Sequence, residues 1–185
     1  MTKRPNPQGK GLVPVLDSLA ESRAAIAVPP KQIDQISSEL FTSLFVLHSK
    51  FQFKPVVGKS YWLYRRDNIF HLSLIAPHEW GGSSFGQYVG ECVLQQDITW
   101  TLKLDTAAAQ DNELMGVIEQ RRREFERALD SADSVDSLLP VYLESLPFYQ
   151  RVFASALAGS LSVSMQKSGI QGLSYAQARG LLTKK

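Results

Sequence analysis

Cysteine is almost absent from this chain of 185 residues, since Cys92 is its only cysteine. A single cysteine excludes an intrachain disulfide and a cysteine-rich zinc site. Cys92 lies beside Val93 and Leu94 in an expected strand, so we interpret it as a small buried apolar side chain rather than a reactive thiol. Only three histidines are present, and their positions lack the spacing of a metal site. We therefore predict no metal and no cofactor.

An excess of either charge is also absent. The chain has 20 basic and 18 acidic residues, which gives a net charge of +2. Dedicated polyanion-binding proteins usually show a marked basic excess, so this balance argues against that class while allowing a local basic patch. No run of about 20 apolar residues is present, as a membrane span would require. Residues 1–11 lack the apolar segment of a signal peptide, so we expect a cytoplasmic protein.

Hydrophobic periodicity predicts a long helix in the first third of the chain. Apolar residues recur at steps of three and four over residues 31–51, as they do on one face of a helix. We expect a shorter helix over residues 12–27 and a flexible tail over residues 1–11. The strongly apolar face of the 31–51 helix must cover another element, and the segment that follows it is the natural candidate.

Residues 59–104 carry the alternating pattern of β-strands. We predict strands over 60–65, 69–76, 86–95 and 98–104, with each strand paired to the next one along the chain. Asp67 and Asn68 suit a tight hairpin turn because both tolerate a left-handed backbone.

The pattern becomes helical after residue 105. We expect helices over 111–130, 146–167 and 175–182, with Gly169 ending the second of them. Ser174 and Gln177 form a capping-box pattern for the last helix. The 146–167 helix is apolar around more than half of its circumference, which predicts either a central buried helix or a homo-oligomer interface.

These elements together predict an α+β fold. It is a four-stranded antiparallel meander backed by a long N-terminal helix and followed by a C-terminal helical bundle. Residues 12–104 form the helix-plus-sheet core, and residues 105–185 pack on it as part of one domain.

Spaced motifs in the predicted sheet resemble those of an uncharacterised family. The motifs are Tyr61-Trp62-Leu63-Tyr64-Arg65-Arg66, Ser73-Leu74-Ile75-Ala76-Pro77-His78-Glu79-Trp80-Gly81, Gly90, Leu94-Gln95, Asp97 and Trp100-Thr101. In combination they resemble the domain of unknown function 2452 (DUF2452) family, of the bacterial type, over residues 33–101. The resemblance implies no particular activity.

The aromatic and basic side chains of the predicted sheet make it the best candidate for a binding surface. One face must pack on the 31–51 helix, and the other carries either Trp62 with Tyr64 or Tyr61 with Leu63. Exposed rings can stack on bases, proline-rich peptides or cations, and neighbouring arginines can pair with phosphates or carboxylates. Alternatively, the C-terminal helices cover this face and every aromatic is core. The candidate surface comprises Tyr61, Trp62, Tyr64, Arg65, Arg66, His78, Glu79, Trp80, Asp97 and Trp100.

An enzymatic interpretation has less support. His78 and Glu79 form a candidate acid–base pair that Asp97 could join in space, but adjacent loop residues rarely face the same ligand. We favour an interpretation in which Glu79 and Asp97 hydrogen-bond to the backbone at two turns. No nucleophile elbow, phosphate loop or dinucleotide fingerprint is present, so we name no catalytic residue.

The densest basic run, Arg121-Arg122-Arg123, lies in the 111–130 helix. Glutamates stand at helical pairing distances from it, so we expect a salt-bridged, solvated face. Arg122 falls within the apolar stripe, from which it snorkels to water or reaches a partner.

We therefore expect a cytoplasmic, non-enzymatic interaction or adaptor protein whose partner is a protein or peptide. RNA or ribosome binding through the same surface is the first alternative, and an enzyme that uses Glu79, His78 or Asp97 is the second. We further expect self-association through residues 146–167.

Overall fold

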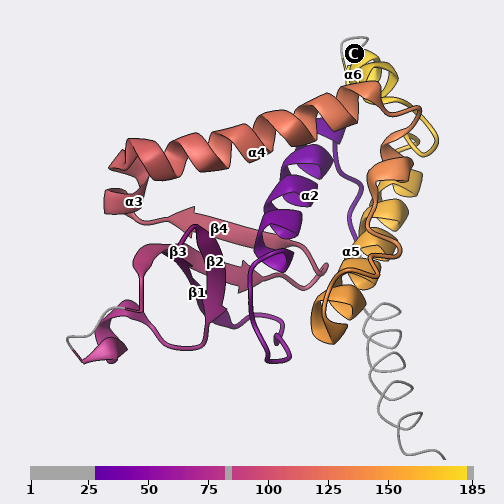
Figure 1. Ribbon diagram of the computed structural model, residues 1–185. Helices are drawn as coiled ribbons and strands as arrows, with labels where there is room; N and C mark the ends of the chain where they lie inside the picture. Colours follow the sequence, from indigo (N-terminus) through magenta and orange to yellow (C-terminus); the bar gives the residue numbers. More distant parts are fainter. Residues whose placement is uncertain (1–27, 82–84, 183–185) are drawn as a thin grey trace, which may run out of the picture.

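The computed structural model describes residues 28–81 and 85–182 of the chain (Figure 1). The tail expected over residues 1–11 and the helix expected over residues 12–27 lie outside the described residues.

Four strands form one antiparallel sheet, as the sequence predicted. They are β1 (Ser60–Arg66), β2 (Ile69–Ser73), β3 (Gln87–Leu94) and β4 (Trp100–Leu104). Asp67 and Asn68 join β1 to β2 with φ angles of 49° and 60°. A two-residue hairpin turn of type I′ needs positive φ at both central positions, so the predicted turn residues are confirmed.

The strand order corrects the predicted meander. The order is β2-β1-β3-β4, so β1 lies between β2 and β3 and pairs antiparallel with both. β2 and β3 therefore run in the same direction and lie on opposite sides of β1. A two-residue turn forces the two strands that it joins to be neighbours, whereas a long connection allows the next strand to pair elsewhere in the sheet. The alternation of apolar residues alone therefore did not reveal the strand order.

Five α-helices and two short 3-10 helices, Pro77–Trp80 and Val135–Leu138, complete the described fold. The α-helices are α2 (Ile33–Leu47), α3 (Thr106–Gln110), α4 (Asn112–Ser131), α5 (Phe148–Lys167) and α6 (Tyr175–Leu182). Gly169 ends α5 with a φ of 68°, in the left-handed region. The backbone N–H of Ser174 donates to Gln177 Oε1 at 3.0 Å, and the N–H of Gln177 donates to Ser174 Oγ at 3.3 Å. The predicted capping box of α6 is therefore confirmed, and with it the α+β class.

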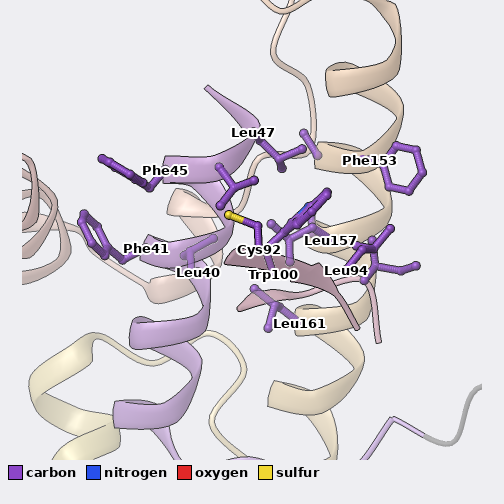
Figure 2. Close-up of a cluster of buried hydrophobic side chains, with 14 of the residues drawn as sticks. Leu40, Phe41, Phe45, Leu47, Cys92, Leu94, Trp100, Phe153, Leu157 and Leu161 are labelled. Carbon is purple, nitrogen blue, oxygen red and sulfur yellow. The ribbon is translucent and has the colours of Figure 1, made fainter. Parts of the chain in front are cut away.

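The long helices lie on one side of the sheet (Figure 1). α2 lies along β4, and α4 crosses the same side, where the Arg121 guanidinium stands 5.0 Å from the ring centre of Phe70. Figure 2 shows Trp100 and Cys92 between Leu40 of α2 and Leu157 of α5. Burial of each large apolar side chain stabilises the fold by about 1.5–3 kcal/mol, so this layer between helices and sheet is the main core.

α5 is buried along most of its length. Its buried residues include Phe153, Leu157, Leu161 and Met165, together with small residues such as Ala154 that allow close helix approach. Of the two roles predicted for this helix, central burial is the one that these contacts support. Self-association through residues 146–167 stays a prediction.

Candidate binding surface

The face of the sheet opposite the helices carries a row of four side chains, which we call the Trp62 row. The strand register places Ser73, Trp62, Glu91 and Lys103 side by side across β2, β1, β3 and β4. Directly opposed residues of an antiparallel sheet share a face. Tyr61, the neighbour of Trp62 in β1, is buried on the helix side, so the Trp62 row faces away from the helices. No helix among the described residues covers this row.

Apolar side chains lie beside the Trp62 row. Val93 and Thr101 form the next opposed pair on the same face, with Val93 partly exposed and Thr101 exposed. Leu74, which directly follows Ser73, the β2 partner of Trp62, is 58% exposed. This end of the sheet is therefore an open surface, on which the partly exposed indole of Trp62 is the largest side chain.

An aromatic cluster closes the other end of the same face. Tyr64 is opposed by His71 and Tyr88 on the neighbouring strands. Trp80 and Phe85, both from the β2–β3 connection, stack on each other with ring centres 5.3 Å apart. Their ring centres lie 6.0 and 5.8 Å from that of Tyr64, with edge-to-face geometry. The connection that passes over β1 is thus anchored by ring contacts, each of which contributes about 0.5–1.5 kcal/mol.

Burial disfavours charge on the titratable side chains of this cluster. The Tyr64 hydroxyl donates to the Ile75 carbonyl at 2.9 Å and accepts from Trp80 Nε1 at 3.0 Å. Burial raises the pKa of Tyr64, although the Trp80 bond opposes the shift, and burial raises the pKa of Tyr88 to about 12. Burial, followed by the positive charges of Lys50 and Arg66, lowers the pKa of His71. The cluster therefore covers the sheet rather than supplying an ionised group.

The two arginines of the predicted surface point in different directions. Arg65 is only 9% exposed at its side chain, bonds to Asn68 and forms an ion pair of 2.7 Å with Glu113 at the start of α4. Arg66 is exposed and lies over the ring of Phe85, with its guanidinium carbon 5.7 Å from the ring centre. Arg65 therefore links the sheet to α4, and only Arg66 belongs to the outer face.

Three aromatic residues of the predicted surface are interior. Tyr61 and Trp100 are each 1% exposed, and their rings meet edge to face at 5.7 Å beneath the helices. Tyr64 is 2% exposed because the aromatic cluster covers it. The structure decides between the two sets that the sequence left open: Tyr61 lies on the helix side of the sheet, and Trp62 and Tyr64 lie on the opposite face. Because the aromatic cluster covers Tyr64, Trp62 is the aromatic side chain of β1 that stays partly exposed on that face.

Glu79 and Asp97 hold turns, as the favoured interpretation predicted. Glu79 Oε2 accepts the backbone N–H of Ala76 at 2.6 Å and so caps the short 3-10 helix Pro77–Trp80. Asp97 Oδ1 accepts the backbone N–H of Thr99 at 3.2 Å and its hydroxyl at 2.6 Å. His78 is exposed, and neither His78 nor Glu79 lines the hollow that Asp97 borders.

A buried ion cluster around Lys31 was not anticipated from the sequence. Lys31 is 6% exposed, and its Nζ lies 2.5 Å from a carboxylate oxygen of Glu39 and 2.5 Å from one of Asp97. Burial alone would lower the pKa of Lys31, but the hydrogen bonds to Asp97 and Glu39 raise it. Lys31 also borders a hollow of about 850 Å³. Because 66 residues separate Lys31 from Asp97, no local pattern could reveal the pair.

The described residues contain no group of three or more histidine, cysteine, aspartate or glutamate side chains that could hold a metal ion. None of the helices that the structure describes is long and apolar enough to cross a membrane.

The sheet and the helix beside it define a known family. Residues 30–120 match the model of the family described as Protein of unknown function (DUF2452), and this part of the chain belongs to that family, as the motif resemblance predicted. The match spans α2, the whole sheet, α3 and the first part of α4, whereas α5 and α6 lie outside it. The bacterial type stays a prediction. No curated protein and no solved structure matches the chain.

Proposed function

We propose that this protein is a non-enzymatic interaction module that binds a protein or peptide on the open end of the sheet, around Trp62. The observation that carries the proposal is a partly exposed tryptophan at the centre of a sheet face that no described helix covers. Tryptophan is among the side chains most enriched at the energetic centres of protein interfaces, because it buries a large rigid surface.

The surroundings of Trp62 support a protein partner. Val93 and Leu74 supply apolar area near it, while Glu91 and Lys103 supply charges of opposite sign in the same row. An apolar centre with a mixed polar rim is the usual anatomy of a protein interface. The two charges also select partners, since a carboxylate or an ammonium in the wrong place is left unpaired.

RNA binding through this face is supported less well. A sheet that stacks on RNA needs several exposed rings and a basic surface. Here Trp80 and Phe85 stack on each other, Tyr64 is buried beneath them, and Glu91 lies beside Trp62. In the Trp62 row the single cation, Lys103, is balanced by this carboxylate, so the row offers no excess of positive charge to a phosphate backbone.

Photo-crosslinking in native lysate tests the proposal. A photoreactive residue is placed at Thr101, on the open face, and in a second sample at Gln120, an exposed position on α4. We expect protein crosslinks from Thr101 that survive nuclease, are absent from Gln120 and disappear in the Trp62→Ala variant. Loss of an interface tryptophan costs about 2 kcal/mol or more, which is roughly thirtyfold in Kd.

A matched control separates a specific loss from a general loss of aromatic surface. Tyr142 is 73% exposed and lies in another part of the chain, so Tyr142→Ala should leave the Thr101 crosslinks unchanged. Equal crosslinking yields for the wild type and Trp62→Ala would refute the proposal. Crosslinks to RNA that vanish with nuclease would replace it with the RNA-binding alternative.

A further inference from the structure

Two arginines interrupt the inward stripe of α4. Leu114, Ile118 and Leu129 of this helix are buried and Phe125 is partly buried, at the spacing of one helical face. Arg121 and Arg122 occupy the turn at the middle of that face and are partly buried. An inward helical stripe ordinarily carries apolar side chains throughout, so two cations at its centre call for an explanation.

Both guanidinium groups lie over phenylalanine rings. The guanidinium carbon of Arg121 is 5.4 Å from the ring centre of Phe45, and that of Arg122 is 4.6 Å from the ring centre of Phe41. Stacking on a ring face leaves the N–H groups at the edge of the guanidinium plane available for acceptors. Figure 2 shows Phe41 and Phe45 on the side of α2 away from Trp100.

The expected salt-bridged face is therefore only partly present. Arg123 pairs with Glu119 at 3.1 Å, one helical turn away. Within residues 28–81 and 85–182, neither Arg121 nor Arg122 forms an ion pair with a carboxylate. Two half-buried cations without a counter-ion are electrostatically favourable positions for an added carboxylate, because the surrounding protein screens the attraction less than water does.

The arginines border a groove between α2 and α4, the two helices that cross in Figure 1. One hollow of about 510 Å³ is bounded by Phe41, Leu44, Phe45, His48, Arg121, Glu124 and Phe125. A second hollow of about 450 Å³ shares Phe41 and Phe125 with the first and extends past Arg122 to Tyr175 on α6. The two hollows are therefore neighbours: Phe41 and Phe125 line both of them, Arg121 borders the first and Arg122 borders the second.

We propose that this groove binds an acidic segment of a partner protein, in which a carboxylate lies within one helical turn of a bulky apolar side chain. The carboxylate pairs with the N–H groups of Arg121 and Arg122, where the planar guanidinium allows two parallel hydrogen bonds. The apolar side chain packs against Leu44 and Phe125, the partly exposed apolar residues that line the first hollow. This groove lies on the helix side of the sheet, so the site is separate from Trp62 and does not depend on the proposed function.

The remaining charges favour an acidic peptide over nucleic acid. Glu124 borders the first hollow, and Glu126, Asp130 and the ion pair between Asp34 and Arg179 border the second. A peptide can place one carboxylate between the arginines and keep the rest of its length uncharged. A nucleic-acid strand carries a phosphate at every nucleotide and would bring several of them close to these carboxylates.

Peptide display against the full chain tests the groove directly. Random peptides are selected on the wild type, and the binding of each enriched peptide is then measured on the wild type and on the Arg121→Gln/Arg122→Gln variant. We expect peptides that combine aspartate or glutamate with leucine, phenylalanine or tryptophan. Their Kd should be weakened at least about tenfold in the double variant and by added salt.

The matched control is Arg123→Gln/Arg127→Gln, which removes the same charge from two exposed positions of α4. It should leave peptide binding unchanged, and thermal melting should show that both double variants are folded. Selected peptides without acidic residues, failure to enrich any peptide, or equal binding to the Arg121→Gln/Arg122→Gln variant would overturn the proposal. Binding of a single-stranded RNA probe, or dimerisation in sedimentation, that depends on these two arginines would assign the groove to another occupant and overturn it as well.

Discussion

Replacement of Lys31 by methionine is expected to be strongly destabilising. Methionine preserves the apolar stem, but it removes the ammonium that lies 2.5 Å from the carboxylates of Glu39 and Asp97. These carboxylate side chains are only 23% and 16% exposed, so water replaces the ammonium only in part. Removal of one partner from a buried ion pair costs about 3–5 kcal/mol. In a domain of this size, the corresponding fall in Tm is roughly 6–20 °C.

Urea unfolding followed by tryptophan fluorescence measures this loss. Lys59→Met removes the same ammonium from an exposed position and should change the free energy of unfolding by less than about 0.5 kcal/mol. In the Lys31→Met/Asp97→Asn variant, one unpaired carboxylate has been removed as well, so the combined loss should be smaller than the sum of the single losses. A loss below about 1 kcal/mol for Lys31→Met, or simple additivity in the double variant, would refute a stabilising role for the cluster.

The dependence of stability on pH provides a second test of the same cluster. Burial alone would raise the pKa of Asp97, but the hydrogen bonds from Lys31 and Thr99 hold it below its ordinary value. The stabilisation that Asp97 gives to the folded state is present above its unfolded pKa of about 3.9 and is lost as the pH falls through its pKa in the folded protein. The pKa of Lys31 is raised in the folded protein, so the stabilisation that Lys31 gives is present below its unfolded pKa of about 10.4 and is lost as the pH rises through its pKa in the folded protein. The wild type should therefore lose stability at both extremes relative to Lys31→Met/Asp97→Asn.

Three further predictions concern the sheet and α4. Gly90→Ala should prevent folding or strongly lower the free energy of unfolding in urea titrations, because a Cβ there would lie 2.3 Å from the Lys103 carbonyl oxygen. As its control, Gly116→Ala places a Cβ in open space on α4 and should raise the free energy of unfolding by about 0.5–1 kcal/mol. The buried thiol of Cys92, whose pKa is raised by burial, should react with a thiol reagent only at the rate of unfolding and promptly in urea. Ultraviolet titration against Tyr88→Phe should show one tyrosine that ionises at about pH 12 because of burial.

Local elements followed from the sequence because their causes are local. Each of them depends on residues a few positions apart: the alternation of the strands, the left-handed backbone conformation that Asp67 and Asn68 adopt at the hairpin turn, and the capping box of Ser174 and Gln177. The same holds for the turns held by Glu79 and Asp97, since each accepts a backbone N–H from a residue two or three positions away.

The candidate surface followed from the sequence only in part. Alternation placed Tyr61 and Trp62 on opposite faces but left open which face the helices cover. That choice depends on where α4 crosses the sheet, and the ion pair between Arg65 and Glu113, 48 residues apart, lies on that side. Phe85 was overlooked because nothing in its neighbourhood shows that the β2–β3 connection passes over Tyr64.

The sequence by itself determined the α+β class, the family and the positions of nearly all described helices and strands, because backbone periodicity and turn chemistry act over a few residues. Only the tertiary structure decided the β2-β1-β3-β4 order, the burial of Trp100, the partners of Lys31 and the position of Arg121 over Phe45. Each of these depends on which distant segments meet, and packing selects among the many pairings that a given pattern of apolar residues allows.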